Sequence, residues 1–235
     1  MSLFADEGAG VVVKLGPNAD QYVKVGDRVG IKWIADACLK CEMCRLGHEA
    51  NCTEGAKCSG YSVDGTFGQY VKSYAKYVTP IPDNLSLEDA SPILCAGVTV
   101  YRAIKEAHLS PGQWVVIPGA GGGLGHLAVQ YANALGFRPL AIDTGSEKKA
   151  LAEKLGAEGW IDFKQSKDIV QDVKNITGGD GAHAAIVASA AAQAYTQALE
   201  YIRPRGTLVC VGLPADCKIQ ADGESSRRPI CLHFH

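Results

Sequence analysis

The chain has 235 residues, of which 47% are hydrophobic and 20% are charged, and its formal net charge is −2. The nearly balanced charge argues against nucleic acid or an anionic membrane surface as a partner, and no apolar run is long enough to span a bilayer. Nine cysteines without a secretory leader favour metal ligands and free thiols in a cytoplasmic protein over a disulfide framework. The length suits between one and two domains.

The first part of the chain is typical of short strands separated by turns. Apolar runs bounded by glycine and aspartate predict strands at Gly10–Gly16, Val25–Val29 and Thr66–Val71. No helix of convincing length is expected before Ala90. Helical spacing over Glu88–Lys105 then predicts helical turns that connect this β-rich part to the rest of the chain.

Four cysteines lie close together in the β-rich part, spaced C-x2-C-x2-C-x7-C. They are Cys38, Cys41, Cys44 and Cys52. Four thiolates at this spacing can surround one tetrahedral zinc ion, as they do in closed structural zinc sites. Chance spacing or a disulfide cluster is the alternative, which a reducing compartment disfavours. His48 lies inside the loop and is expected on the surface, because four thiolates already complete the coordination shell.

A glycine-rich turn follows the apolar run Trp114–Ile117, which predicts a buried strand. Beyond the turn, apolar residues repeat at helical spacing until Gly136 ends the predicted helix. Such a turn directs the amides of a helix N-terminus at a pyrophosphate. The strict G-x-G-x-x-G pattern is absent, and the spacing is the variant G-x-x-G-x-x-G. The glycines of the turn are Gly119, Gly121, Gly122, Gly123 and Gly125.

The next predicted strand, Pro139–Ile142, ends in Asp143. An acidic side chain at this place accepts hydrogen bonds from the adenosine ribose and disfavours a 2′-phosphate, which predicts NAD rather than NADP. A turn residue at a strand end is the alternative for Asp143. Lys148 follows where its charge would lie near the ribose or the pyrophosphate, and a solvated helix residue is the alternative for it.

Strands and helices continue to alternate after Asp143. This alternation predicts βαβ units with right-handed crossovers, and therefore a parallel, doubly wound sheet. The predicted strands are Trp160–Phe163, Ala184–Ala188 and Thr207–Val211, and the predicted helices are Glu147–Leu155, Asp168–Thr177 and a helix holding Tyr195, Ala198, Leu199 and Ile202.

Four segments together resemble the zinc-dependent alcohol dehydrogenases of the medium-chain dehydrogenase/reductase family, and are most similar to the fungal ethanol-type enzymes. The segments are C-L-K-C-E-M-C-R-L-G-H-E-A-N-C, D-G-T-F-G-Q-Y-V, S-P-I-L-C-A-G-V-T-V-Y and G-A-G-G-G-L-G-H-L-A-V-Q-Y-A. The resemblance runs from about Glu7 to about Lys218. It implies an α/β protein with a partial GroES-like β domain at residues 1–92, an incomplete Rossmann domain at 93–218 and an unrelated tail at 219–235.

The resemblance also implies roles for individual residues. The four clustered cysteines match the structural zinc ligands, Cys95 matches a ligand of the catalytic zinc, and Glu7 matches a carboxylate beside that metal. From the residues alone, a buried, small hydrophobic residue is the favoured interpretation of Cys95. The implied cofactor contacts are Gly119, Gly122, Gly123, Leu124 and Gly125 at the pyrophosphate, Asp143 and Lys148 at the ribose, and Thr99, Gly212 and Leu213 at the nicotinamide.

The implied activity is the oxidation of a primary alcohol to an aldehyde, with zinc lowering the pKa of the alcohol and NAD accepting hydride. The chain departs from the family at both ends. Asp6 stands where the family has a histidine ligand, the segment with the remaining cysteine ligand is absent, and the resemblance fades after Ala215. We therefore expect a fragment with little or no turnover. A loss of the sixth strand also argues against the family's homo-oligomer.

Two alternatives to an active alcohol dehydrogenase follow from these departures. The first is a non-catalytic fragment that binds zinc or NAD without turning over a substrate. The second is another medium-chain reductase that acts on polyols, secondary alcohols or quinones. The zinc-independent quinone reductases are disfavoured by the four-cysteine cluster and by Cys95.

Overall fold

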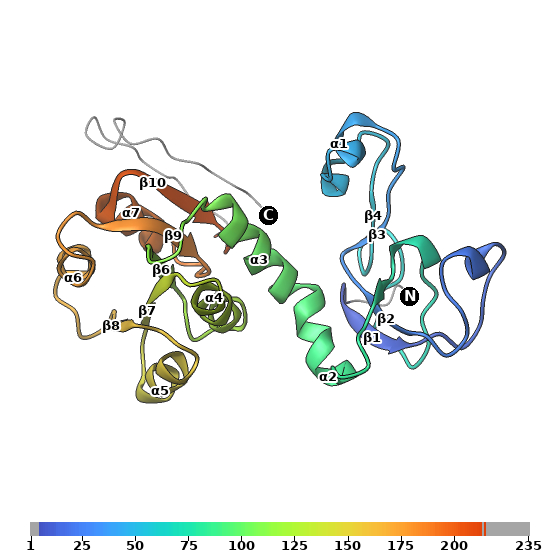
Figure 1. Ribbon diagram of the computed structural model, residues 1–235, viewed down its shortest axis with the longest axis horizontal. Coiled ribbons are helices and arrows are strands. Elements are labelled where there is room, and N and C mark those ends of the chain that lie inside the picture. The colour runs from blue at the N-terminus through green and yellow to red at the C-terminus, as the bar shows by residue number, and fades with distance from the viewer. Residues whose placement is uncertain (1–4, 213, 215–235) are drawn as a thin grey trace. The chain divides into compact units, whose positions relative to one another are not determined.

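The computed structural model describes residues 5–212 and residue 214 (Figure 1). The chain divides into two compact units, Met1–Cys95 and Ala96–His235. Leu213 and the predicted tail at 219–235 lie outside the described residues.

The first unit is built on short antiparallel strands. A three-stranded sheet has the order β1-β2-β5, and a two-stranded sheet pairs β3 with β4. The helices here are single turns. The strands are β1 (Gly8–Val11), β2 (Arg28–Ile31), β3 (Ile34–Asp36), β4 (Lys57–Cys58) and β5 (Thr79–Pro80). The helices are α1 (Glu42–Arg45) and α2 (Leu87–Ala90), with 3-10 turns η1 (Ala19–Gln21), η2 (Glu49–Asn51), η3 (Ala75–Tyr77) and η4 (Ser91–Leu94).

The predicted strands of this unit need correction. β1 ends at Val11, so most of the predicted strand Gly10–Gly16 lies beyond it, and β2 begins only at Arg28. The predicted strand Thr66–Val71 is wrong, because this segment is irregular and pairs with no strand among the described residues. Its alternating apolar residues suit a strand, but a strand forms only where a neighbouring chain accepts and donates its backbone hydrogen bonds.

The second unit is a doubly wound parallel sheet, as predicted. Its five strands have the order β10-β9-β6-β7-β8, and every pair is parallel. In sequence order this is the 3-2-1-4-5 arrangement of dinucleotide-binding folds. The strands are β6 (Trp114–Pro118), β7 (Arg138–Asp143), β8 (Gly159–Asp162), β9 (Ala182–Val187) and β10 (Ile202–Cys210). The helices are α3 (Ala96–Glu106), α4 (Gly123–Ala134), α5 (Ser146–Lys154), α6 (Ile169–Ile176) and α7 (Ala192–Tyr201).

The core of the second unit lies on both faces of the sheet. Side chains alternate along β6, so that Val115 and Ile117 pack on the face covered by α3, α4 and α5. Trp114 and Val116 pack on the opposite face, which α6 and α7 cover (Figure 1). Within the described part of the chain, no helix combines the length and the apolar character needed to cross a membrane.

Local signals set the ends of the helices. Gly136 adopts a φ of 79° just after α4, and the Asp168 side chain accepts a hydrogen bond from the Gln171 amide at the start of α6. The predicted helix that holds Ile202 is wrong at this residue, because Ile202 is extended and pairs with Ala182 as the first residue of β10. β10 is therefore longer than the predicted strand, with a shift of register before Thr207.

Candidate functional site

The structure brings the four clustered cysteines of the first unit together. The Sγ atoms of Cys38, Cys41, Cys44 and Cys52 all lie within 4.8 Å of one another, and the Sγ atoms of Cys38 and Cys44 are 3.8 Å apart. Four sulfurs at zinc–sulfur distances of about 2.3 Å in a tetrahedron are separated by about 3.8 Å. The cluster thus fits a closed tetrahedral zinc site. His48 is exposed and lies outside the cluster, as expected.

Backbone amides hold the sulfurs in place. The Cys41 amide donates to Cys38 Sγ at 3.3 Å, and the Cys44 amide donates to Cys41 Sγ at 3.5 Å as Cys41 caps α1. Hydrogen bonds from the Cys44 and Thr53 amides lower the pKa of Cys41 to about 6. Burial, followed by a hydrogen bond with the Cys41 side chain, raises the pKa of Cys44 to about 12. The loop therefore favours a thiolate at Cys41, and a bound cation would favour thiolates at the other three positions.

A second potential metal cluster in the first unit combines two carboxylates and a thiol. Ligand atoms of Asp6, Glu7 and Cys95 lie within 4.8 Å of one another, and all three residues are half-buried. Cys95 follows the 3-10 turn η4, whose Leu94 is buried. Gly30 of β2 leaves room for Leu94, since a Cβ on Gly30 would lie 2.6 Å from a Leu94 methyl carbon.

The three acidic groups of this cluster share protons. A hydrogen bond with the Asp6 carboxylate, and then burial, raises the pKa of Glu7 to about 7. Burial, and then the same carboxylate, raises the pKa of Cys95 to about 12. Burial favours the neutral acid at Asp6, but hydrogen bonds from Glu7 and Cys95 outweigh it and lower the pKa of Asp6. Asp6 thus carries the negative charge of the cluster and accepts hydrogen bonds from Glu7 and Cys95, whose protons a divalent cation would displace.

In the second unit the glycine-rich turn lies between β6 and α4. The Gly119 amide donates to the Ile142 carbonyl at 2.8 Å, and Gly119 has a φ of 84°, which favours glycine. A Cβ on Gly125 would lie 2.0 Å from the Gly119 carbonyl oxygen, so only glycine allows α4 to start this close to the turn. No side chain caps α4, and the first amides of a helix have no partner inside it. This uncapped N-terminus fits an anionic pyrophosphate.

Asp143 lies at the end of β7, buried beside the turn. Its Oδ2 accepts from the Gly121 amide at 2.9 Å, and its Oδ1 accepts from the Thr144 amide and from Lys148 Nζ, both at 2.8 Å. A Cβ on Gly121 would lie 2.6 Å from Lys148 Cδ, so the missing side chain lets the Lys148 stem lie over the turn. The structure thus brings the predicted ribose residues next to the predicted pyrophosphate turn.

A cavity of about 480 Å³ opens beside Asp143, at the carboxyl ends of the strands. It lies where the strand order reverses between β6 and β9, which is where open α/β sheets bind their ligands. Sequence reasoning missed part of its lining: the predicted strand ends mark this edge of the sheet, but they do not indicate which nearby side chains face the cavity. The missed lining residues include Phe163, Ile169, Ser189, Gln193 and Gln197.

Of the three remaining predicted site residues, the structure describes Gly212 and Thr99 but not Leu213. Gly212 lies against Ser189, because a Cβ on Gly212 would lie 2.7 Å from the Ser189 carbonyl oxygen, and the Gly212 amide donates to Val187 at 2.9 Å. Gly212 thus lies at the carboxyl end of the sheet, at the side of β9. Thr99 is half-buried on α3. Leu213 lies outside the described residues.

The chain is similar to known proteins in both units. Residues 3–83 match the alcohol dehydrogenase GroES-like domain, and residues 123–230 match the zinc-binding dehydrogenase family. The chain is 50% identical to an alcohol dehydrogenase of Schizosaccharomyces pombe and 49% identical to alcohol dehydrogenase 1 of Emericella nidulans. Each alignment covers 216 residues, which are 92% of this chain and 61% of the relative.

A solved structure supports the same relationship. The alcohol dehydrogenase of the archaeon Aeropyrum pernix superposes with a TM-score of 0.86 at 27% identity, over 99% of this chain and 67% of that protein. The chain therefore spans about three fifths of the length of the curated relatives it matches. Its two matched domains and its fungal relatives together support a relationship to the zinc-dependent alcohol dehydrogenases of the medium-chain dehydrogenase/reductase family.

Proposed function

We propose that the chain is part of an NAD-linked, zinc-dependent alcohol dehydrogenase that converts a primary alcohol to an aldehyde by hydride transfer to the nicotinamide. The observation that carries this proposal is the cavity at the carboxyl ends of the strands, where an uncapped helix N-terminus lies beside a buried aspartate. The names of the fungal relatives support the class of substrate.

The second unit would bind the cofactor. The amides of Gly123, Leu124 and Gly125 would hold the pyrophosphate at the start of α4, where the helix dipole favours an anion. Asp143 would accept hydrogen bonds from the ribose hydroxyls, and its charge would disfavour a 2′-phosphate. Lys148, already paired with Asp143, would lie beside the ribose. By family resemblance, Thr99, Gly212 and Leu213 would border the nicotinamide.

The first unit would bind metal at two places. The four-cysteine cluster would hold a structural zinc that stabilises the loop between β3 and β4. Asp6, Glu7 and Cys95 supply three ligand atoms and leave a position open, which is the ligand count of a catalytic site. A divalent metal held there would act as a Lewis acid on an alcohol oxygen. The cysteines that the structure describes form no disulfide, which favours a cytoplasmic location.

A second candidate function is cofactor and zinc binding without turnover. The observation that favours it is the composition of the second cluster, in which two carboxylates accompany one thiol. Two hard oxygen ligands and one sulfur suit zinc less well than the thiolate and imidazole ligands of tight zinc sites. The cluster would then bind metal weakly, and the chain would keep a zinc-stabilised loop and an NAD pocket.

Zinc content, NAD affinity and ethanol oxidation should be measured on one sample of the full chain. About two zinc ions per chain, saturable NAD binding and turnover would establish the dehydrogenase. About one zinc ion and NAD binding without turnover would establish the binding function. A chain that binds neither zinc nor NAD would contradict both. Glu7→Gln with a matched Glu49→Gln control would show whether the second cluster contributes to any turnover.

A further inference from the structure

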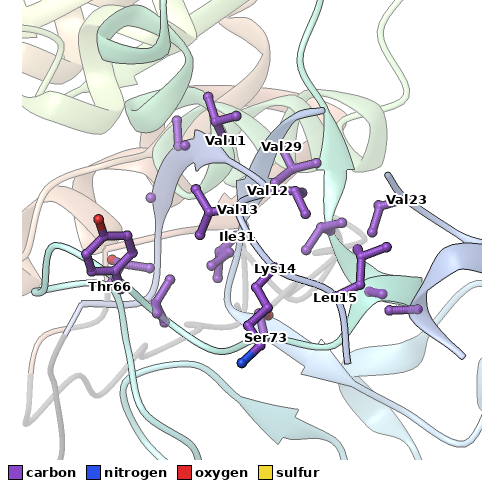
Figure 2. Close-up of a pocket in the computed structure, with 18 of the residues that line it drawn as sticks. Val11, Val12, Val13, Lys14, Leu15, Val23, Val29, Ile31, Thr66 and Ser73 are labelled. Atoms are coloured by element: carbon purple, nitrogen blue, oxygen red, sulfur yellow. The ribbon is translucent and has the colours of Figure 1, made fainter. Parts of the chain in front are cut away.

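A cavity in the first unit differs in its lining from the one beside Asp143. It has a volume of about 420 Å³ and lies between the chain that leaves β1 and the segment at residues 66–73, with Val29 and Ile31 of β2 in its lining (Figure 2). Among the described residues, its lining includes neither a carboxylate nor the start of an α-helix. The groups that suit a dinucleotide therefore lie in the second unit, around the cavity of about 480 Å³.

A buried tyrosine of the second unit, Tyr195, joins α7 to the chain that leaves β10. Its side chain is 1% exposed and packs in the apolar cluster on the face of the sheet that α6 and α7 cover. Its hydroxyl donates a hydrogen bond to the carbonyl oxygen of Gly212, two residues beyond the end of β10. A buried tyrosine hydroxyl needs a polar partner, so this bond ties the position of the ring to one backbone group.

Gly212 has both of its backbone polar groups engaged within the second unit. Its amide donates to the Val187 carbonyl at the end of β9, at 2.9 Å, and its carbonyl accepts from Tyr195. A Cβ on Gly212 would lie 2.7 Å from the Ser189 carbonyl oxygen, so a larger residue would force the two segments apart. Contacts with β9, with Ser189 and with α7 thus fix the position of Gly212.

Ser189 connects Gly212 to the cavity. Ser189 lines the cavity, and a Cβ on Gly119 of the glycine-rich turn would lie 3.0 Å from the Ser189 amide nitrogen. The turn, Ser189 and Gly212 are therefore packed in series at the carboxyl ends of β6, β9 and β10. Gln193 and Gln197 of α7 also line the cavity, whereas Tyr195 does not. An influence of the Tyr195 hydroxyl on a bound ligand would therefore pass through Gly212.

We propose that Tyr195 is a positioning residue for the nicotinamide half of NAD, and that it acts through the carbonyl of Gly212. This inference rests on the proposed function, in which Gly212 borders the nicotinamide. With the bond in place, the Gly212 backbone holds one position, and the nicotinamide meets a preorganised surface. Without it, the carbonyl loses its partner and the chain beyond β10 turns to find another. The adenosine half, held at Asp143, does not depend on this bond.

The test removes only the hydroxyl, by Tyr195→Phe in the full chain. Calorimetry gives the dissociation constants of NAD and of ADP-ribose, which lacks the nicotinamide. We expect the variant to bind NAD about three- to tenfold more weakly, as the loss of one hydrogen bond implies, and to bind ADP-ribose with unchanged affinity. At saturation, the fluorescence of bound NADH should also move toward that of free NADH, because the reduced nicotinamide is less firmly held.

Tyr131→Phe is the matched control, since Tyr131 is a half-buried tyrosine on α4 that lies outside the cavity lining. It should leave both dissociation constants and the NADH emission unchanged. Equal weakening of NAD and ADP-ribose in Tyr195→Phe, or no change in either, would overturn the inference but not the proposed function, because the unaltered chain would still bind NAD. An unaltered chain that binds neither nucleotide would overturn the proposed function and this inference with it.

Discussion

The two sheets of this protein use similar valine-rich strands with opposite results. In the second unit Val115, Val116 and Ile117 are fully buried, because helices cover both faces of the parallel sheet. In the first unit Val11, the last residue of the edge strand β1, is 49% exposed, and Val13, just beyond the strand, is 63% exposed. The residue types of a strand therefore do not decide by themselves whether its side chains are buried. The difference arises because crossover helices cover both faces of the parallel sheet in the second unit, whereas the three-stranded sheet of the first unit keeps an exposed edge.

This difference predicts where each unit obtains its stability. The second unit has two large apolar clusters on either side of its sheet, while the third cluster, in the first unit, is formed around the cysteines. We therefore expect hydrophobic packing to stabilise the second unit and metal binding to contribute much of the stability of the first.

Removal of zinc should have the largest effect, and only on the first unit. Chelation, or Cys44→Ser, should release about one zinc ion per chain and expose the backbone amides of residues 38–58 to rapid hydrogen exchange, because structural zinc sites supply folding free energy directly. Cys58→Ser is the matched control, since Cys58 lies outside the cluster. Elemental analysis and hydrogen exchange measure both effects. If the amides of the second unit lost their protection from hydrogen exchange to the same extent, zinc would stabilise both units and this expectation would be wrong.

A cavity in the parallel sheet should have the next largest effect. Ile186→Ala on β9 removes a fully buried side chain and should lower the free energy of unfolding of the second unit by about 2–5 kcal/mol. Val13→Ala, at an exposed position of the first unit, should change the free energy of unfolding by less than about 0.5 kcal/mol. Urea unfolding followed by tryptophan fluorescence compares them. Similar losses for the two variants would show that the chain just beyond β1 is buried in solution.

Two glycines in the first turn of α4 offer a sharper contrast within the second unit. Gly125→Ala would place a Cβ 2.0 Å from the Gly119 carbonyl oxygen, whereas Gly123→Ala meets no atom within 4 Å. We expect Gly125→Ala to lose about 1–3 kcal/mol of unfolding free energy, together with NAD binding. Gly123→Ala should keep its stability. Thermal unfolding and NAD titration separate the two effects, and equal stability of both variants would contradict the close approach of turn and helix.

The smallest expected effect concerns the choice of cofactor. Asp143→Asn keeps an oxygen for the Gly121 amide but removes the negative charge, so NADP should bind up to about tenfold more tightly relative to NAD. Asp162→Asn, at the end of the neighbouring strand β8 and outside the cavity lining, should leave the ratio of the two dissociation constants unchanged. An unchanged ratio in Asp143→Asn would place the ribose elsewhere.

Much of the second unit was predictable because its signals are local. An apolar run, a glycine turn and a helical repeat indicated β6, the turn and α4 to within one or two residues. Asp143 and its neighbouring turn were predicted together, and the Gly121 amide joins them. The lining residues Phe163 and Ser189 were missed, because the sequence does not say which residues after a strand face the ligand cavity.

The first unit was less predictable because its structure depends on contacts between distant residues. Thr66–Val71 has the composition of a strand but no strand partner within residues 5–212, and β1 ends earlier than its valines suggest. Asp6 and Glu7 meet Cys95 only because η4 packs against β1 and β2, and nothing in the separate segments indicates this. Family resemblance, rather than periodicity, singled out Cys95.

The sequence by itself determined the features that short-range chemistry specifies: four thiols at metal-binding spacing, a glycine turn between strand and helix, and an acid at the next strand end. Tertiary structure alone decided which strand-like segments became strands and which acidic groups share protons. The physical reason is that a helix or a turn satisfies its hydrogen bonds within a few residues, whereas a strand or a mixed ligand cluster needs partners brought from elsewhere in the chain.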